Sequence, residues 1–181
     1  MATSTYRWLL PCAVILGMAV VMAQLGWEQT HGGILRHHLL NNPGLPAISN
    51  AWGLLLLPLL GALTGWVLLR RTQKHPGALK PAAAGLFGAL AAGAALSVAF
   101  VTHGEPAATQ VMLAILVASV LFPVYRAEYL FGFVLGMTFV FGPVLPALVA
   151  SVPMLISAVS RLVLWRAATS AMRRTRAGSA G

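Results

Sequence analysis

The hydrophobic positions of this chain form long, nearly uninterrupted runs, and polar residues gather between them. A helix needs about 20 apolar residues to cross the ~30 Å hydrocarbon layer of a bilayer. The runs that meet or approach this length cover residues 8–27, 51–69, 81–101, 106–125 and 128–165. The last run is too long for one span, so we divide it at 142–146, where two prolines interrupt helical hydrogen bonding. The pattern predicts an all-α fold, a polytopic transmembrane helix bundle of six spans.

Positive charge is distributed unevenly over the segments that join these spans. With the N-terminus inside, eleven of the twelve lysines and arginines fall on the cytoplasmic side, and only Arg36 lies outside. Such a bias in short loops sets the orientation of membrane proteins. The five tryptophans all fall near predicted span ends, as an aromatic belt requires. We therefore expect a multi-pass protein of the cell inner (plasma) membrane with both termini in the cytoplasm.

The first apolar run has an alternative interpretation. Arg7, a short apolar stretch and the small-residue pattern ending at Ala23 resemble a secretory signal with its cleavage site. Cleavage would leave five spans in the same orientation, but the apolar stretch continues beyond Ala23 to Trp27. We expect a single transmembrane domain over 1–166, with an outer loop at 28–50, and a basic cytoplasmic tail over 167–181 that frays near lipid headgroups.

The composition supports a chain that lies in lipid. It is 59% hydrophobic and 8% charged, whereas soluble domains carry about 25% charged residues. The net charge of +9 is explained by cytoplasmic flanks, and the basic residues are spread over helix ends, so we expect no nucleic-acid partner. Aspartate is absent, which excludes aspartate-pair catalysis and an Asp-rich magnesium site. Glu128 is expected to pair with Arg126 at the cytoplasmic interface.

Small residues spaced four apart predict close packing between the spans. They are Gly61 and Gly65 in the second span, Gly132 and Gly136 in the fifth, and Gly85, Ala89, Gly93 and Ser97 in the third. We expect the third span to be central, because a stripe of glycine and alanine gains little from facing acyl chains. Pro58, Pro123 and Pro153 are expected inside spans, where the kinks they cause can open a cavity between helices.

The outer loop at 28–50 is longer than a simple connection requires. Apolar residues recur at helical spacing between Ile34 and Leu40, which predicts a short amphipathic helix on the outer surface. Ser49 and Asn50 are then expected to cap the second span.

Polar residues able to do chemistry gather on the predicted outer side. A bundle could bring imidazole and carboxylate groups together as ligands for Zn, Cu or Fe. The candidate metal ligands are Glu28, His31, His37, His38, His103 and Glu105, and the candidate catalytic residues are His31, His103 and Glu105. The spacing matches no established metal motif, and the plainer interpretation is that these side chains bind loop backbone and lipid headgroups.

Three functions are compatible with this pattern. The first is a small-solute binding or transport subunit, which no intramembrane ion relay drives because no charge lies near mid-bilayer. The second is an interfacial, metal-dependent enzyme that acts on a lipid or lipid-linked substrate through the outer histidines and glutamates. The third is a membrane assembly or scaffold protein. The partners implied are the lipid bilayer, a small-molecule or lipid ligand, and a membrane partner subunit or a second copy of the chain.

Overall fold

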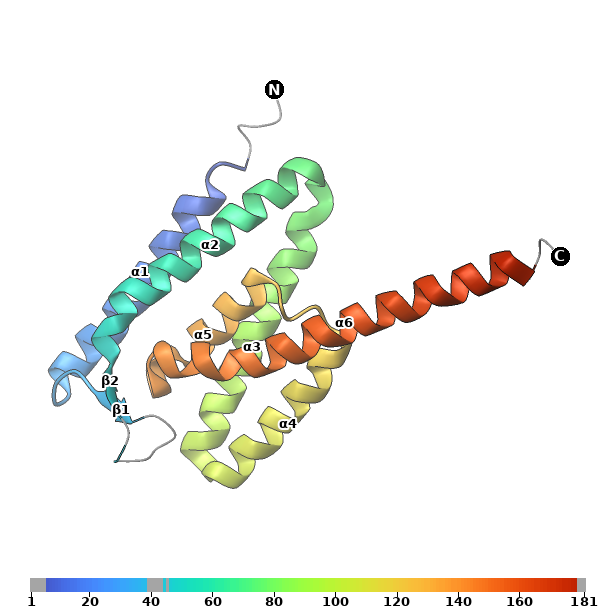
Figure 1. The fold of residues 1–181 in the computed structure, drawn as a ribbon. Coiled ribbons are helices and arrows are strands. Elements are labelled where there is room, and N and C mark those ends of the chain that lie inside the picture. Colours follow the sequence, from blue (N-terminus) through green and yellow to red (C-terminus); the bar gives the residue numbers. More distant parts are fainter. Residues whose placement is uncertain (1–5, 39–43, 45, 179–181) are drawn as a thin grey trace.

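The computed structural model is a bundle of six α-helices with a two-stranded hairpin at one end (Figure 1). It describes residues 6–38, 44 and 46–178, with side chains up to residue 164 and at Arg166. The helices are α1 (Leu9–Thr30), α2 (Gly53–Lys74), α3 (Leu79–His103), α4 (Glu105–Leu121), α5 (Ala127–Phe141) and α6 (Val144–Gly178). The strands are β1 (Arg36–His38) and β2 (Ala47–Ser49), and two short 3-10 turns, η2 (Asn50–Trp52) and η3 (Pro76–Ala78), precede α2 and α3.

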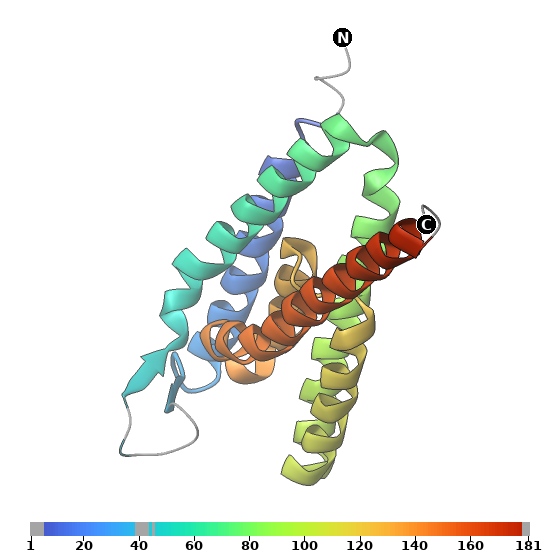
Figure 2. The ribbon, with the colours of Figure 1, turned by 45° about the vertical axis from the view of Figure 1, so that its right-hand side comes forward.

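Helices α1 and α2 lie side by side and run in opposite directions (Figures 1 and 2). Glycines allow this close approach, because a side chain in their place would overlap the backbone of the facing helix. A Cβ added at Gly65 would lie 2.5 Å from the Cα of Leu10, and one added at Gly61 would overlap the carbonyl oxygen of Ala13. The predicted small-residue face of the second span is therefore an α1 contact.

Glycines also allow close contact between α3 and α5. An added Cβ at Gly132 would overlap the carbonyl oxygen of Leu86, and one at Gly136 would overlap that of Leu90. From the other side, a Cβ added at Gly93 of α3 would overlap the carbonyl oxygen of Phe133. The predicted small-residue faces of the third and fifth spans are thus confirmed, and they face each other.

Helix α5, and not α3, lies at the centre of the bundle. It contacts α1, α2, α3 and α6, and more than half of its residues are buried. Its Phe131, Val134 and Leu135 pack with Val21 and Leu57 of the first hairpin in one core cluster. The expectation of a central third span was wrong because the small-residue stripe of α3 serves a single neighbour, whereas the large side chains of α5 fill space on several sides.

Four helical segments are long and apolar enough to cross a membrane: Leu9–Thr30, Asn50–Lys74, Pro76–His103 and Val144–Leu164. Helices α4 and α5 are apolar but have 17 and 15 residues, which corresponds to about 26 and 22 Å at 1.5 Å per residue. Large apolar side chains such as Leu55, Val117 and Leu155 are exposed on the outside of the bundle. The fold is compatible with an integral membrane protein by the length and composition of its helices.

The break expected in the last apolar run is present. Helix α5 ends at Phe141 and α6 begins at Val144. Gly142 between them has a φ of +69°, a left-handed conformation that glycine adopts without steric cost. Pro153 lies inside α6 as expected, whereas Pro123 lies outside any helix, because α4 already ends at Leu121.

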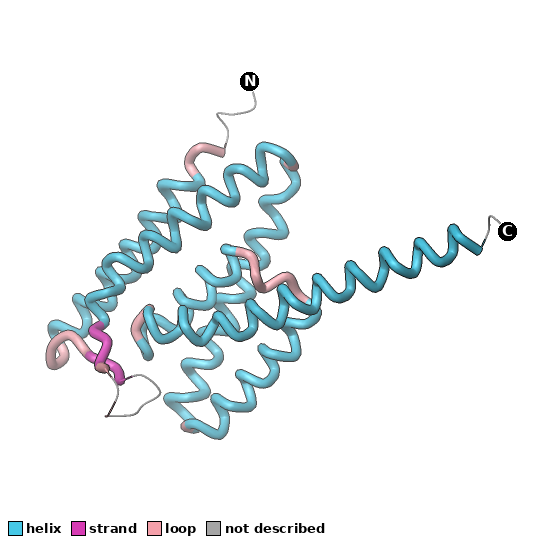
Figure 3. Tube along the Cα trace, viewed as in Figure 1, coloured by secondary structure: helices cyan, strands magenta, loops and turns pink. Residues whose placement is uncertain are grey.

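The outer segment differs from the expected amphipathic helix. Arg36 pairs with Ser49, His37 with Ile48 and His38 with Ala47 in an antiparallel hairpin, which Figure 3 shows in magenta. An isolated helix of this length is only marginally stable, and pairing with the segment before α2 satisfies the same backbone groups. The loop residues 39–43 and 45 lie outside the described residues. Ser49 caps the 3-10 turn η2, since its hydroxyl accepts a hydrogen bond from the Ala51 N–H. The expected cap of the second span is absent, because α2 begins after Trp52 with no side-chain cap and the Asn50 side chain donates to Glu28 instead.

The C-terminal segment also differs from the expected frayed tail. Helix α6 continues without interruption through 35 residues to Gly178, about 52 Å at 1.5 Å per residue. Figure 1 shows its last part projecting away from the other helices. The boundary expected at residue 166 is therefore not a break in secondary structure.

Candidate functional site

Glu28, the first of the predicted outer-face ligands, is a buried structural anchor. Its carboxylate accepts hydrogen bonds from Gln24 Nε2 at 2.9 Å, from Asn50 Nδ2 at 2.5 Å and from the Leu35 N–H at 3.0 Å. The bonds from Asn50 and Leu35 tie the C-terminal end of α1 to both arms of the hairpin. The carboxylate is therefore occupied by structural hydrogen bonds, and all three of its donors are uncharged.

The two histidines proposed as bases are held by their own helix ends. The ring of His31 stacks on Trp27 with 3.7 Å between ring centroids, and its Nδ1 lies 2.9 Å from Thr30 Oγ1. The Nδ1 of His103 lies 2.6 Å from Thr102 Oγ1. His31 follows α1 and His103 ends α3, so they belong to separate turns.

The remaining candidates are also dispersed. His37 and His38 are neighbours in β1, and Glu105 is exposed in the first turn of α4. Among the residues that the structure describes, no group of three or more His, Cys, Asp or Glu side chains is placed to hold a metal ion. The predicted ligands Glu28, His31, His37, His38, His103 and Glu105 are therefore not brought together as a metal centre.

The other buried acid lies at the opposite end of the bundle. Glu128, in the first turn of α5, is fully buried and forms an ion pair with Arg71 of α2 at 2.8 Å. The expected partner Arg126 is not the one the fold uses. Arg71 also donates to the carbonyl oxygen of Ala78 at 3.5 Å, and Thr64 donates to that of Ala127 at 3.2 Å. The ion pair and the Thr64 bond join α2 to α5, and the Arg71–Ala78 bond joins α2 to the turn η3.

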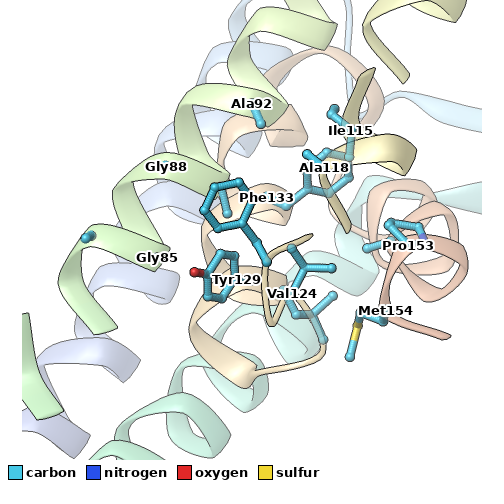
Figure 4. Close-up of a pocket in the computed structure, with 15 residues that line it drawn as sticks. Gly85, Gly88, Ala92, Ile115, Ala118, Val124, Tyr129, Phe133, Pro153 and Met154 are labelled. Atoms are coloured by element: carbon cyan, nitrogen blue, oxygen red, sulfur yellow. The ribbon is translucent and has the colours of Figure 1, made fainter. Parts of the chain in front are cut away.

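The best-formed candidate site is a half-open apolar cavity of about 360 Å³ between α3, α4, α5 and α6. It lies on the side of α3 that faces α4 and α6, and Figure 4 shows side chains from all four helices pointing into it. The lining residues are Ala84, Gly85, Gly88, Ala89, Ala92, Ile115, Ala118, Phe122, Val124, Tyr129, Leu130, Phe133, Ala150, Pro153 and Met154. Tyr129 supplies the sole polar side-chain group of this lining.

Small side chains on α3 create the open space. Ala84, Gly88 and Ala92 recur at intervals of four residues and so share one face of the helix. A Cβ added at Gly88 would meet no heavy atom within 4 Å. At the edge of this face the ring of Tyr129 packs on Gly85, where an added Cβ would lie 2.6 Å from the ring carbon Cε2. Large side chains from α4, α5 and α6 thus form walls of the cavity, and the small residues of α3 leave its space unfilled.

Reasoning from the sequence missed this site because it sought polar residues. A signal was present: α3 carries a second small-residue face at 84, 88 and 92 beside the one that packs on α5. A second smooth face on one helix indicates either another close helix or unfilled space. Pro153, expected to help open a cavity, does line this one.

Comparison with protein-family models, with curated proteins and with solved structures finds no match to this chain.

Proposed function

We propose that this chain is a six-span inner-membrane protein, with both termini in the cytoplasm, that binds an apolar small molecule in the cavity between α3 and α6. In this proposal it serves as a small-solute binding or transport subunit without an intramembrane ion relay. The cavity carries the proposal, because its volume of about 360 Å³ and its lining from four helices are those of a ligand pocket.

The order of the helices supports six crossings. Each described connection between consecutive helices is short except for the hairpin segment, so neighbours in sequence run in opposite directions. Helices α4 and α5 are short for a ~30 Å layer, but α5 is surrounded by other helices and needs little contact with lipid. Eleven of the twelve lysines and arginines then lie on one side, as the positive-inside bias requires for a cytoplasmic N-terminus.

The lining of the cavity defines the ligand as apolar. Ligand pockets measure about 300–1,000 Å³ and are mostly hydrophobic with a few polar groups, and this cavity of about 360 Å³ lies within that range. No charged side chain lines it. The ion pair that the described residues contain, Arg71–Glu128, joins α2 to α5 and is not part of the lining. The cavity lining therefore has no series of charged side chains that could relay an ion, and the proposal does not rely on one.

A single substitution tests the proposal. Gly88→Leu would place a side chain in the open cavity without backbone overlap. Gly26→Leu is the matched control, because Gly26 is exposed on α1 and an added Cβ there also meets nothing within 4 Å. Intact-protein mass spectrometry after release from detergent micelles counts the amphiphiles that the protein retains.

We expect the wild type and Gly26→Leu to retain a bound molecule and Gly88→Leu to lose it. Both variants should keep the thermal stability of the wild type or exceed it, since replacing glycine inside a helix stabilises it by up to about 1 kcal/mol. Equal retention by all three proteins would refute a ligand site in the cavity.

A further inference from the structure

We propose that the ligand is a lipid with an anionic headgroup, which Lys80, Arg126 and Arg161 bind at one end of the cavity while a hydrocarbon chain fills the apolar part. This inference rests on the proposed function. It names the class of ligand and assigns a headgroup site that the apolar lining alone does not indicate.

Three basic residues from three different elements lie within a few residues, or one hydrogen bond, of the segments that line the cavity. Figure 4 shows Gly85, Tyr129, Val124 and Met154 together at one end of the cavity, with Ala92 and Ile115 at the other. Arg126 lies in the α4–α5 connection, two residues after the lining residue Val124 and three before Tyr129.

The other two basic residues belong to α3 and α6. Lys80 lies in the first turn of α3, four residues before the lining residue Ala84, and so on the same face of the helix. Arg161 of α6 donates through Nη2 to the carbonyl oxygen of Leu121 at 2.8 Å. The next residue, Phe122, lines the cavity. We infer from these positions that all three basic residues lie toward this end of the cavity.

The charges of these three residues are not compensated within the described part of the chain. The ion pair found there is Arg71–Glu128, and Glu128 is fully buried against α2. Lys80, Arg126 and Arg161 have no carboxylate partner among the described residues. Arginine and lysine bind phosphate oxygens through charge-assisted hydrogen bonds, so an anionic headgroup is the partner whose charge complements this end.

Tyr129 provides a second, independent indication. Its hydroxyl is the one polar side-chain group of the lining, and Figure 4 shows it beside Gly85 at the basic end. No hydrogen bond holds this hydroxyl within the described residues, although its ring is fixed against α3. The hydroxyl is accessible, so it is available to donate a hydrogen bond to a headgroup oxygen at this end.

The test compares two lipids on the full-length protein. Wild type in dodecyl maltoside micelles is titrated with dioleoyl phosphatidylglycerol or dioleoyl phosphatidylcholine, and bound lipid is counted by intact-protein mass spectrometry. Each basic residue near a membrane surface contributes about fivefold in binding of an anionic lipid, so three predict a preference on the order of 100-fold for phosphatidylglycerol.

The variant K80Q/R126Q/R161Q should bind both lipids equally. The control R7Q/R70Q/K74Q removes the same charge from residues that neither line the cavity nor adjoin a lining residue, and it should keep the preference. Loss of the preference in the control, or its survival in the first variant, overturns the headgroup site. Thermal stabilisation by millimolar inorganic phosphate alone, to the extent seen with phosphatidylglycerol, would overturn the assignment to a lipid.

Gly88→Leu separates this inference from the proposed function. If Gly88→Leu leaves the retention of both lipids intact, the ligand site itself is refuted. If Gly88→Leu abolishes retention but K80Q/R126Q/R161Q keeps its preference, the apolar site stands and the headgroup site alone is refuted.

Discussion

The ion pair between Arg71 and Glu128 is predicted to be a main determinant of stability, because it joins the first helix pair to the central helix. Arg71 Nη1 lies 2.8 Å from Glu128 Oε1. The glutamate side chain is 0% exposed, and its other oxygen, Oε2, has no hydrogen-bond partner. Arg71→Met would leave this carboxylate buried next to an apolar side chain.

The two partners are expected to differ in what their loss costs. Two unit charges at 2.8 Å attract by about 6 kcal/mol at an effective dielectric constant of 20, and desolvation offsets part of that. Breaking a buried pair from one side destabilises by about 3–5 kcal/mol, which is the expected effect of Arg71→Met. Glu128→Met should cost less, because Arg71 is 23% exposed and can extend toward water. The double variant should be more stable than Arg71→Met, since it leaves no unpaired buried charge.

The measurement is unfolding of the purified variants in mixed micelles with increasing sodium dodecyl sulfate, followed by tryptophan fluorescence. Arg70→Met is the matched control: Arg70 is the adjacent arginine and stacks over the Trp66 ring at 3.9 Å. Its loss should cost about 0.5–1 kcal/mol. An Arg71→Met protein no less stable than Arg70→Met, or a double variant less stable than Arg71→Met, would refute the reasoning.

The remaining predictions concern packing, the hairpin and orientation. Gly61→Leu should destabilise the protein by more than about 3 kcal/mol, because the added side chain overlaps the α1 backbone, whereas Gly26→Leu should not; equal melting temperatures would contradict this. Asn50→Ala removes a donor from the buried Glu28 carboxylate and should cost about 1.5–3 kcal/mol, with faster proteolysis within 31–50 and unchanged cleavage elsewhere. A fluorescent protein fused after Gly181 should fluoresce and alkaline phosphatase at the same position should be inactive; the reverse pattern would place the C-terminus outside.

Much of the scaffold could be predicted from the chain because lipid imposes simple rules. Long apolar runs must form helices with all backbone groups paired internally, and the break at Gly142 follows from local backbone chemistry. The glycine faces of α2, α3 and α5 were predicted for the same reason, since residues four apart share a face whatever the helix packs against. The sequence did not predict which of these faces pack against each other. The central position of α5 therefore appeared only in the structure.

The partners of the two buried glutamates were decided by tertiary structure. Residues 34–41 have a helical pattern of apolar positions, yet the hairpin forms because Glu28 and Asn50, 22 residues apart, meet and fix both arms. Glu128 pairs with Arg71, 57 residues away, and not with its neighbour Arg126. Such partners depend on distances between helices, which sequence spacing does not contain.

What the sequence by itself determined was therefore local: which segments are helical, where they end, and which faces are smooth enough for close contact. Only the tertiary structure decided what each face contacts: Gly93 packs on α5, whereas Gly88 borders empty space. The physical reason is that backbone hydrogen bonding and transfer to lipid are properties of a segment, whereas a cavity is a shortfall of volume among four helices. A shortfall of that kind exists only once the helices are in place.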